Sequence, residues 1–325
     1  MAKKSSALPF PISRLLLAVA GAIVLAGLVW WITRPSIPSF DGERALRHVQ
    51  TQVEFGPRVF GTDGYQRTLD WMIRQLEQTA DAVSPQPFAY TDAHDSTKVW
   101  GGTNIVASFN LHPDGGRRVM LAAHWDTRPV ADQDPDSTNW DQPVPGANDG
   151  GSGVAVLIEM ARLLAEQPPE IGVDLVFFDL EDIGDDLGPD ADSSTVANPF
   201  AIGSHRFVEE NPEYRPQFGI LLDMVCDADL RIPRESYSTI NAGSVVDRVW
   251  EAAERVGATA FLDEVGGPVV DDHVAFLQRG IPVIDLIHYP FPSTWHTMAD
   301  VPSACSAESL QQVGDVLVEV VYSDS

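Results

Sequence analysis

The sequence predicts a single-domain, three-layer α/β sandwich with a mixed, largely parallel central sheet, preceded by one N-terminal transmembrane helix. Apolar stretches of strand length alternate with helical patterns, which is typical of parallel strands joined by helices. The 325 residues show no internal repeat and no second domain boundary, so one core is expected. Residues 15–32 carry no charged side chain and are long enough to cross a bilayer.

Segment 15–32 is interpreted as a membrane anchor, with a cleaved signal peptide as the alternative. Basic residues that include Lys3 and Lys4 precede it, and such residues keep a chain end in the cytoplasm. Residues 1–14 are therefore expected to be cytoplasmic. Domain 36–325 is expected outside the cytoplasm, in the periplasm or the extracellular space, and would be secreted if the segment is cleaved.

Helices are predicted where apolar side chains recur at helical spacing. Ala45 and Val49 share one side of the first helix, and Leu69, Met72 and Leu76 have core spacing in the second. The predicted helices are Asp41–Gln52, Tyr65–Thr79, Val154–Glu166, Ser204–Glu210, Ser244–Val256 and Ala307–Val321.

Strands are predicted from short apolar runs, of which Ile281–Ile287 reads as one buried on both faces. Two acidic loops, Asp132–Gly146 and Asp185–Pro199, separate elements, and long loops in compact domains are often functional. The predicted strands are Asn104–Phe109, Arg118–Ala123, Val173–Phe178, Phe218–Asp223 and Ile281–Ile287.

The charge of the chain excludes two classes of partner. The formal net charge is −26, and without the four basic residues before Pro35 the remainder carries −30. So acidic a domain argues against binding nucleic acid or an anionic membrane surface. A solvated acidic surface is the favoured interpretation, with recruitment of basic substrates as the alternative. The oligomeric state expected is a monomer.

The two cysteines, Cys226 and Cys305, are too few for a disulfide scaffold and lack zinc-finger spacing. They can form one bridge in an oxidising compartment or remain as two buried thiols. The second state is the one expected.

Acidic and imidazole side chains gather at or just beyond the predicted C-terminal ends of strands, where sites form in open α/β sheets. A single Asp after a strand is usually a helix cap or a loop carboxylate. Several such residues at one edge, from distant parts of the chain, favour a hydrolase-like metal site. They are His124, Asp149, Glu181, Asp182, Asp223, Trp295 and His296.

Motifs at these positions resemble, in order, those of the zinc-dependent aminopeptidases, which share a zinc exopeptidase fold. The motifs are Phe55-Gly56-Pro57-Arg58, His124-Trp125-Asp126, Gly146 to Gly153, Glu181-Asp182, Gly203-Ser204, Asp223 and His296-Thr297. Within that superfamily, three motifs look like the glutaminyl cyclases, which convert N-terminal glutamine into pyroglutamate. These are Asp271-Asp272-His273, Pro290-Phe291-Pro292 and Trp295-His296-Thr297. The resemblance runs from about Phe40 to the end.

The resemblance implies one zinc ion per chain and a ligand set for it. Asp149, Asp182 and His296 fall on the three zinc ligands, and Glu181 falls on the general acid/base. Bacterial cyclases resemble this chain in placing Asp, rather than a second Glu, after that residue. Three protein ligands leave a coordination position for substrate, as a catalytic zinc requires.

The resemblance also implies which residues act on the substrate, a peptide or protein with N-terminal glutamine. Asp223 and Asp271 fall on the two acids that complete the catalytic hydrogen-bond network, and Trp295 falls on the tryptophan that lines the substrate pocket. Glu181 would take a proton from the substrate α-amine and return it to the departing ammonia. Neighbouring acids such as Asp271 would raise its pKa toward neutrality.

Two other functions remain open at this point. A dinuclear aminopeptidase of the same fold would use His124 and Asp223 to hold a second zinc, and Glu181 would activate water. An inactive peptidase-like binding ectodomain is the third candidate. We interpret His124 as a structural histidine or one hydrogen-bonded to ligands. His273 is expected to orient neighbouring acids rather than to bind metal.

Overall fold

The structure is a computed structural model that describes residues 37–111, 115–185 and 198–323. The chain divides into two compact units, Met1–Ile37 and Pro38–Ser325, and the second is described here by itself. The expected anchor 15–32 lies outside the described residues. Within the described ranges, no helix combines the length and the apolar character that a membrane crossing requires.

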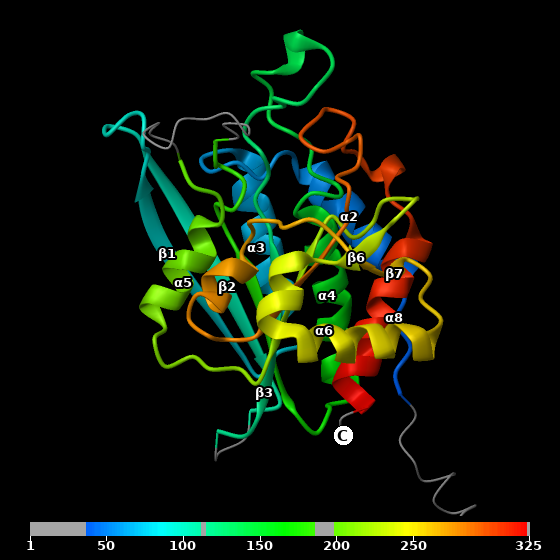
Figure 1. Ribbon diagram of the computed structural model, residues 1–325. Helices are drawn as coiled ribbons and strands as arrows, with labels where there is room; N and C mark the ends of the chain where they lie inside the picture. Colours follow the sequence, from blue (N-terminus) through cyan, green and yellow to red (C-terminus); the bar gives the residue numbers. More distant parts are fainter. Residues whose placement is uncertain (1–36, 112–114, 186–197, 324–325) are drawn as a thin grey trace, which may run out of the picture. The chain divides into compact units, whose positions relative to one another are not determined.

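A mixed six-stranded sheet forms the centre of the domain, in the order β1-β2-β4-β3-β5-β8 (Figure 1). Four adjacent strands, β4, β3, β5 and β8, are parallel, whereas β2 runs antiparallel to both β1 and β4. The largely parallel sheet predicted from the sequence is therefore confirmed. The strands are β1 Ala82–Thr91, β2 Val99–Phe109, β3 Arg118–His124, β4 Gly172–Phe178, β5 Gly219–Asp223 and β8 Val283–Ile287.

Helices cover both faces of this sheet, because its strands alternate between two apolar clusters. Leu121 of β3 joins the larger cluster, which includes residues of α2, α3, α4, α6 and α8. Its neighbour Met120 joins the smaller cluster with Phe207 of α5 and Phe276 of α7. The helices are α2 Gly42–Phe55, α3 Asp63–Glu77, α4 Gly151–Glu166, α5 Ile202–Glu210, α6 Ser236–Val256, α7 His273–Leu277 and α8 Ala307–Ser323.

Smaller elements complete the described fold. Two short strands, β6 Ile232–Arg234 and β7 Phe261–Val265, pair in parallel as a separate sheet. Two 3-10 turns, Ser137–Asn139 and Pro302–Ala304, lie in loops. The first belongs to the long loop between β3 and α4, which projects at the top of the view in Figure 1.

Strand β1 is absent from the sequence-based prediction. It contains Pro85 and Pro87, which lower strand propensity and are tolerated in sheets mainly on edge strands. β1 is such an edge strand, since it pairs only with β2. Pairing along ten residues outweighs the local preference of the segment.

The predicted start of α6 at Ser244 is wrong, because the helix begins at Ser236. The carboxylate of Glu235 caps it and accepts hydrogen bonds from the N–H groups of Tyr237 and Ser238. Non-helical backbone angles at Ala242 kink the helix and interrupt the spacing on which the prediction relied.

The expectation of two free thiols is also wrong, because Cys226 and Cys305 form a disulfide. They are 79 residues apart in sequence, yet their Cα atoms lie 4.7 Å apart, within the range that a disulfide spans. A long-range approach of this kind leaves no local trace in sequence spacing. The bond ties the segment after β5 to the segment before α8.

Candidate active site and metal centre

The predicted site residues meet at the C-terminal edge of the parallel strands. His124 and Asp223 are the last residues of β3 and β5, Glu181 and Asp182 follow β4, and Asp149 directly precedes α4. The turn after β8 brings His296 back to the same edge. Parallel strands place their carboxyl ends together, which is why residues distant in sequence converge here.

The three predicted zinc ligands form one buried group. The Nε2 atom of His296 lies 3.1 Å from Asp182 Oδ1 and 3.7 Å from Asp149 Oδ2. One candidate ligand atom from each residue lies within 4.8 Å of the others. The side chains are at most 7% exposed, so this is an enclosed N/O donor set rather than a surface acidic cluster.

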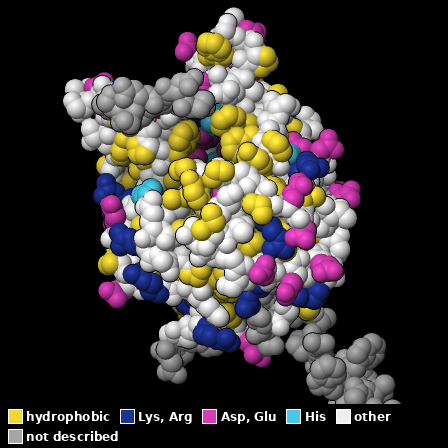
Figure 2. All heavy atoms as spheres, viewed as in Figure 1, with side chains coloured by type: hydrophobic (Ala, Val, Ile, Leu, Met, Phe, Trp, Pro, Cys, Tyr) yellow, Lys and Arg dark blue, Asp and Glu magenta, His cyan; other side chains and the backbone are white. Residues whose placement is uncertain are grey.

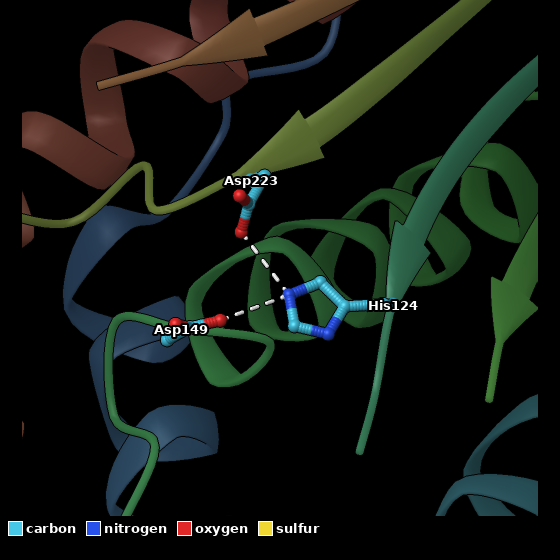
Figure 3. Close-up of side chains that lie close together, drawn as sticks. All are labelled: His124, Asp149 and Asp223. Atoms are coloured by element: carbon cyan, nitrogen blue, oxygen red, sulfur yellow. Dashed lines mark hydrogen bonds and ion pairs between the residues drawn. The ribbon is translucent and has the colours of Figure 1, made fainter. Parts of the chain in front are cut away.

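A second group shares Asp149 with the first. The Nε2 atom of His124 lies 3.1 Å from Asp149 Oδ1 and 3.1 Å from Asp223 Oδ1 (Figure 3). The other carboxylate oxygen of Asp149 faces His296. Asp149 therefore bridges two sets of potential ligands, and His124 contacts carboxylates that the sequence analysis assigned to metal binding and catalysis.

A third group lies behind Asp271 and comprises that residue, His273 and Asp285. His273 Nε2 is 3.4 Å from Glu235 Oε2, and its Nδ1 is 3.9 Å from Asp285 Oδ2. These contacts agree with the prediction that His273 orients acidic side chains. Asp285 was not predicted, because it lies inside an apolar strand where its side chain looks merely out of place.

A cavity of 330 Å³ opens beside the first group. Figure 2 shows hydrophobic side chains around a hollow in which acidic and imidazole groups are visible. Trp295 lines it, as predicted, and packs 4.8 Å from Phe291 and 3.9 Å from the His296 ring. The lining comprises Asp149, Glu181, Asp182, Phe200, Asp223, Met224, Pro268, Val269, Val270, Asp271, Ile287, Phe291, Trp295 and His296.

Sequence reasoning missed part of the apolar wall, namely Phe200, Met224 and residues 268–270. Their positions next to predicted functional residues offered a signal. Met224 follows Asp223, and 268–270 directly precede Asp271. Phe200 has no such neighbour, because only the fold brings the start of α5 to the cavity.

The first group fits a zinc ion by the chemistry of its donors. Two carboxylates and one imidazole suit zinc, which binds nitrogen and oxygen ligands. The Oδ2 atom of Asp182 is buried and has no hydrogen-bond partner among the described residues. A buried carboxylate oxygen without a partner is costly, and a bound cation would satisfy it.

A comparison with protein families decides the classification. Residues 104–321, more than half of the chain, match the model of peptidase family M28. The chain belongs to this family.

Solved structures show what this M28 chain is similar to. A Zn-dependent exopeptidase from Parabacteroides distasonis has a TM-score of 0.82 and 35% identity, covering 88% of this chain and 99% of that one. A glutaminyl cyclase of Bacteroides thetaiotaomicron, bound to N-acetylhistamine, has a TM-score of 0.82 and 35% identity, covering 89% and 100%.

A curated relative points to the same two names within the M28 family. Glutaminyl-peptide cyclotransferase of Bos taurus is 25% identical over 276 residues, 76% of this chain and 70% of that protein. The α/β fold with a zinc exopeptidase-like sheet is thus shared with peptidases and cyclases alike. The residues of the site must distinguish the two activities.

Adjacent acids in this M28 site have opposite electrostatic environments. Burial, and then the charge of Asp271, raise the pKa of Glu181 well above its usual range. Burial also acts on Asp182, but the neighbouring His296 outweighs it, so the pKa of Asp182 lies below its usual value. Glu181 therefore suits proton transfer, whereas Asp182 stays ionised as a ligand does.

The bridging carboxylate and the ligand histidine are shifted as well. Burial, and then the charge of Asp182, raise the pKa of Asp149 to about 6. Burial opposes the charge on His296, but nearby acids led by Asp182 raise its pKa to about 9. These shifts describe the side chains alone, and a bound metal would favour the ionised acids and the neutral imidazole.

Fully buried charges hold the loop that carries Asp149. The Arg58 guanidinium donates to the carbonyl oxygens of Gly146 (2.6 Å) and Asp149 (3.1 Å). The Asp300 carboxylate accepts from the N–H groups of Asn148 (2.7 Å) and Asp149 (3.1 Å). The family motif at residues 55–58 thus acts by fixing a ligand backbone.

Asp126 does the same for the Glu181-Asp182 pair. Its two carboxylate oxygens accept from the N–H groups of Glu181 and Asp182, each at 3.1 Å. The same carboxylate lies 3.5 Å from Nδ1 of His124. The motif His124-Trp125-Asp126 therefore couples both metal-side groups.

Backbone strain is concentrated at this site. Leu180, Met224 and His296 have positive φ angles of 55°, 49° and 54°, a region that residues other than glycine rarely adopt. They lie directly before Glu181, directly after Asp223 and at the ligand histidine itself. Such strain persists only where surrounding structure enforces it, and it is common at functional sites.

Proposed function

We propose that this M28 protein cyclises N-terminal glutamine of peptides or proteins to pyroglutamate and releases ammonia. The observation that carries the proposal is one cavity that combines the three-residue ligand group, the buried acid Glu181 and the wall formed by Trp295. The likeness to a bacterial glutaminyl cyclase over that chain's full length supports it.

One zinc ion per chain would be held by Asp149, Asp182 and His296. When bound, it would polarise the side-chain carbonyl of the substrate glutamine. The apolar wall around the ligands limits water near the reacting groups, which strengthens electrostatic interactions there.

Glu181 would be the general acid/base of the reaction. It takes a proton from the α-amine as that nitrogen bonds to the side-chain amide carbon, and it gives a proton to the departing ammonia. A carboxyl with a raised pKa serves both steps, since it must accept and release a proton near neutral pH.

Asp223 and Asp271 would complete the hydrogen-bond network around Glu181 and hold the amide nitrogen of the tetrahedral intermediate. Burial, and then the charge of Asp223, raise the pKa of Asp271 well above its usual range, so it can donate a hydrogen bond. Trp295 would form the side of the pocket against which the glutamine side chain packs.

A dinuclear aminopeptidase is the second candidate, and one observation favours it. His124, Asp149 and Asp223 form a second compact donor group that shares Asp149 with the first. In that case Glu181 would activate water for peptide hydrolysis. Trp295 and Asp271, which match the cyclases, favour the first candidate.

Mass spectrometry of the purified full-length protein with two peptides tests these candidates. With a Gln-initiated peptide, we expect a product lighter by one ammonia, and with a Leu-initiated peptide no change. A chelator should abolish the reaction. Release of free leucine would instead establish the aminopeptidase, and a full-length zinc-loaded protein inert toward both would contradict both enzymatic proposals.

We further propose that segment 15–32 anchors the protein, with the catalytic domain in the periplasm or the extracellular space. The apolar segment and the Cys226–Cys305 disulfide support this, since such bonds persist in oxidising compartments. Protease added to intact cells, or to spheroplasts if an outer membrane is present, should digest the catalytic domain. Protection until the cytoplasmic membrane is broken would contradict the proposal.

A further inference from the structure

Two residues outside the ligand set, Arg128 and Asp132, connect two of the proposed ligands from behind. Both lie in the loop between β3 and α4, which the sequence analysis regarded only as acidic and long. Neither has a role in the proposed reaction. Their contacts converge on Asp182 and His296.

Arg128 links the loop to the segment that carries Asp182. Its side chain is only 4% exposed, and one guanidinium nitrogen, Nη1, donates to the carbonyl oxygens of Asp182 (3.0 Å) and Gly184 (2.5 Å). The remaining donors form a fork on the Asp132 carboxylate, with Nη2 at 2.5 Å and Nε at 3.2 Å. A planar fork of this kind fixes a carboxylate in orientation as well as position.

Asp132 in turn faces the ligand imidazole. Its Oδ1 lies 3.4 Å from Nδ1 of His296, on the ring nitrogen opposite the one that faces Asp149 and Asp182. The backbone N–H of Gln133 also donates to the carbonyl of His296 at 3.3 Å. An acid at Nδ1 favours the tautomer whose Nε2 lone pair is available to a metal.

The loop does not need Asp132 to keep its shape, because Asp134 already performs that task. The Asp134 carboxylate accepts from the N–H groups of Asp136 (2.9 Å) and Met298 (2.8 Å) and from the side chain of Asn139 (3.1 Å). These contacts fold the loop and attach it to the turn after His296. Asp132 is thus free to serve the imidazole.

We propose that Arg128 and Asp132 are positioning residues that orient His296 for metal binding and thereby raise the affinity of the chain for zinc. The inference rests on the proposed zinc role of Asp149, Asp182 and His296. Removing a partner that orients a metal ligand typically weakens metal binding by about 10–100-fold.

Zinc affinity of the purified full-length protein, measured by competition with a chromogenic chelator, tests this without any assay of activity. We expect Asp132→Ala to weaken zinc binding by about 10–100-fold. Asp132→Asn should fall several-fold below wild type yet above the alanine variant, because its amide oxygen still accepts from Nδ1–H without a charge. Asp136→Ala is the matched control, since that exposed acid belongs to the same loop and contacts only Thr138 and its own turn.

Each outcome decides the matter. Unchanged affinity in Asp132→Ala, or an equal loss in the control variant, would overturn the inference, because the loop as a whole would then be responsible. If the alanine variant does not fold, as circular dichroism would show, Asp132→Asn decides, and wild-type affinity in it overturns the inference. Wild-type protein that binds no zinc would overturn the metal-site proposal itself, which separates the two failures.

Discussion

His296 and His124 contact the two oxygens of the same carboxylate, Asp149, but different groups stand behind their imidazole rings. Behind His296 lies Asp132, whose other contacts are to a single arginine side chain. Behind His124 lies Asp126 at 3.5 Å, and its two oxygens already accept from backbone N–H groups. Only His296 therefore has an acid committed to its orientation.

The difference teaches that similar donor sets need not bind the same number of ions. Burial opposes charge on His124, but the carboxylates of Asp126, Asp149 and Asp223 raise its pKa well above its usual range. A protonated His124 neutralises the pair of acids that a second zinc would otherwise neutralise. We therefore expect one zinc ion, held on the His296 side.

The largest effect is expected from breaking the His296 side. His296→Ala removes a proposed ligand, so zinc affinity should fall by more than the about 10–100-fold that an outer partner contributes, and cyclase activity should reach background. Elemental analysis and the ammonia-release assay measure both. Full zinc content in this variant would contradict the ligand assignment.

Removing the proposed acid/base tests chemistry without touching the ligands. Glu181→Gln should lower kcat by about 10²–10⁴-fold, the usual contribution of general acid/base catalysis, because the amide cannot carry the proton to ammonia. Zinc content should match wild type. A decrease in KM-dependent binding with normal kcat would show that Glu181 holds substrate instead.

The corresponding change on the other side should affect stability more than metal content. His124→Ala leaves the buried acids Asp149 and Asp223 without their shared partner, so the free energy of unfolding should fall by about 1.5–3 kcal/mol. Urea titration of metal-free protein measures this. A wild type with two zinc ions, reduced to one in the variant, would instead support the dinuclear enzyme.

A smaller effect separates both histidines from His273, the imidazole of the third group. Burial opposes ionisation of Glu235, but its bonds with His273 and the N-terminus of α6 lower its pKa to about 2 from an ordinary 4.5. A lowered carboxyl pKa means that its stabilisation is complete above pH 4.5 and is lost as pH falls toward 2. The loss is on the order of 2 kcal/mol.

Urea titrations of wild type and Glu235→Gln between pH 7 and pH 3 measure this difference. The gap in unfolding free energy between the two proteins should narrow once the pH falls below 4.5. A gap that is constant over this range would mean that Glu235 acts through packing rather than through its charge.

Local patterns predicted the sheet well but its neighbours less well. Buried strands such as β4 carry continuous apolar runs, and the sequence recorded their positions to within a residue or so. β1 and the first turns of α6 were missed, because Pro85, Pro87 and the kink at Ala242 contradict local rules that tertiary contacts override.

The candidate site followed a similar division. Asp149, Asp182 and His296 were predicted as one ligand set, and the structure brings them together, although their roles stay a proposal. Their supports were not predicted, since Arg128 reaches Asp182 across 54 residues and Asp132 reaches His296 across a still longer interval. Nothing in the local sequence marks such a partner.

By itself, the sequence determined which side chains end the parallel strands, and hence that acids and imidazoles meet at one edge. That much follows from local apolar periodicity, because a buried strand imposes its own pattern. The tertiary structure alone decided that Cys226 meets Cys305, that Asp149 bridges two histidines and that Phe200 joins the cavity wall. These depend on chain segments that approach through packing of the core, which no short window of sequence encodes.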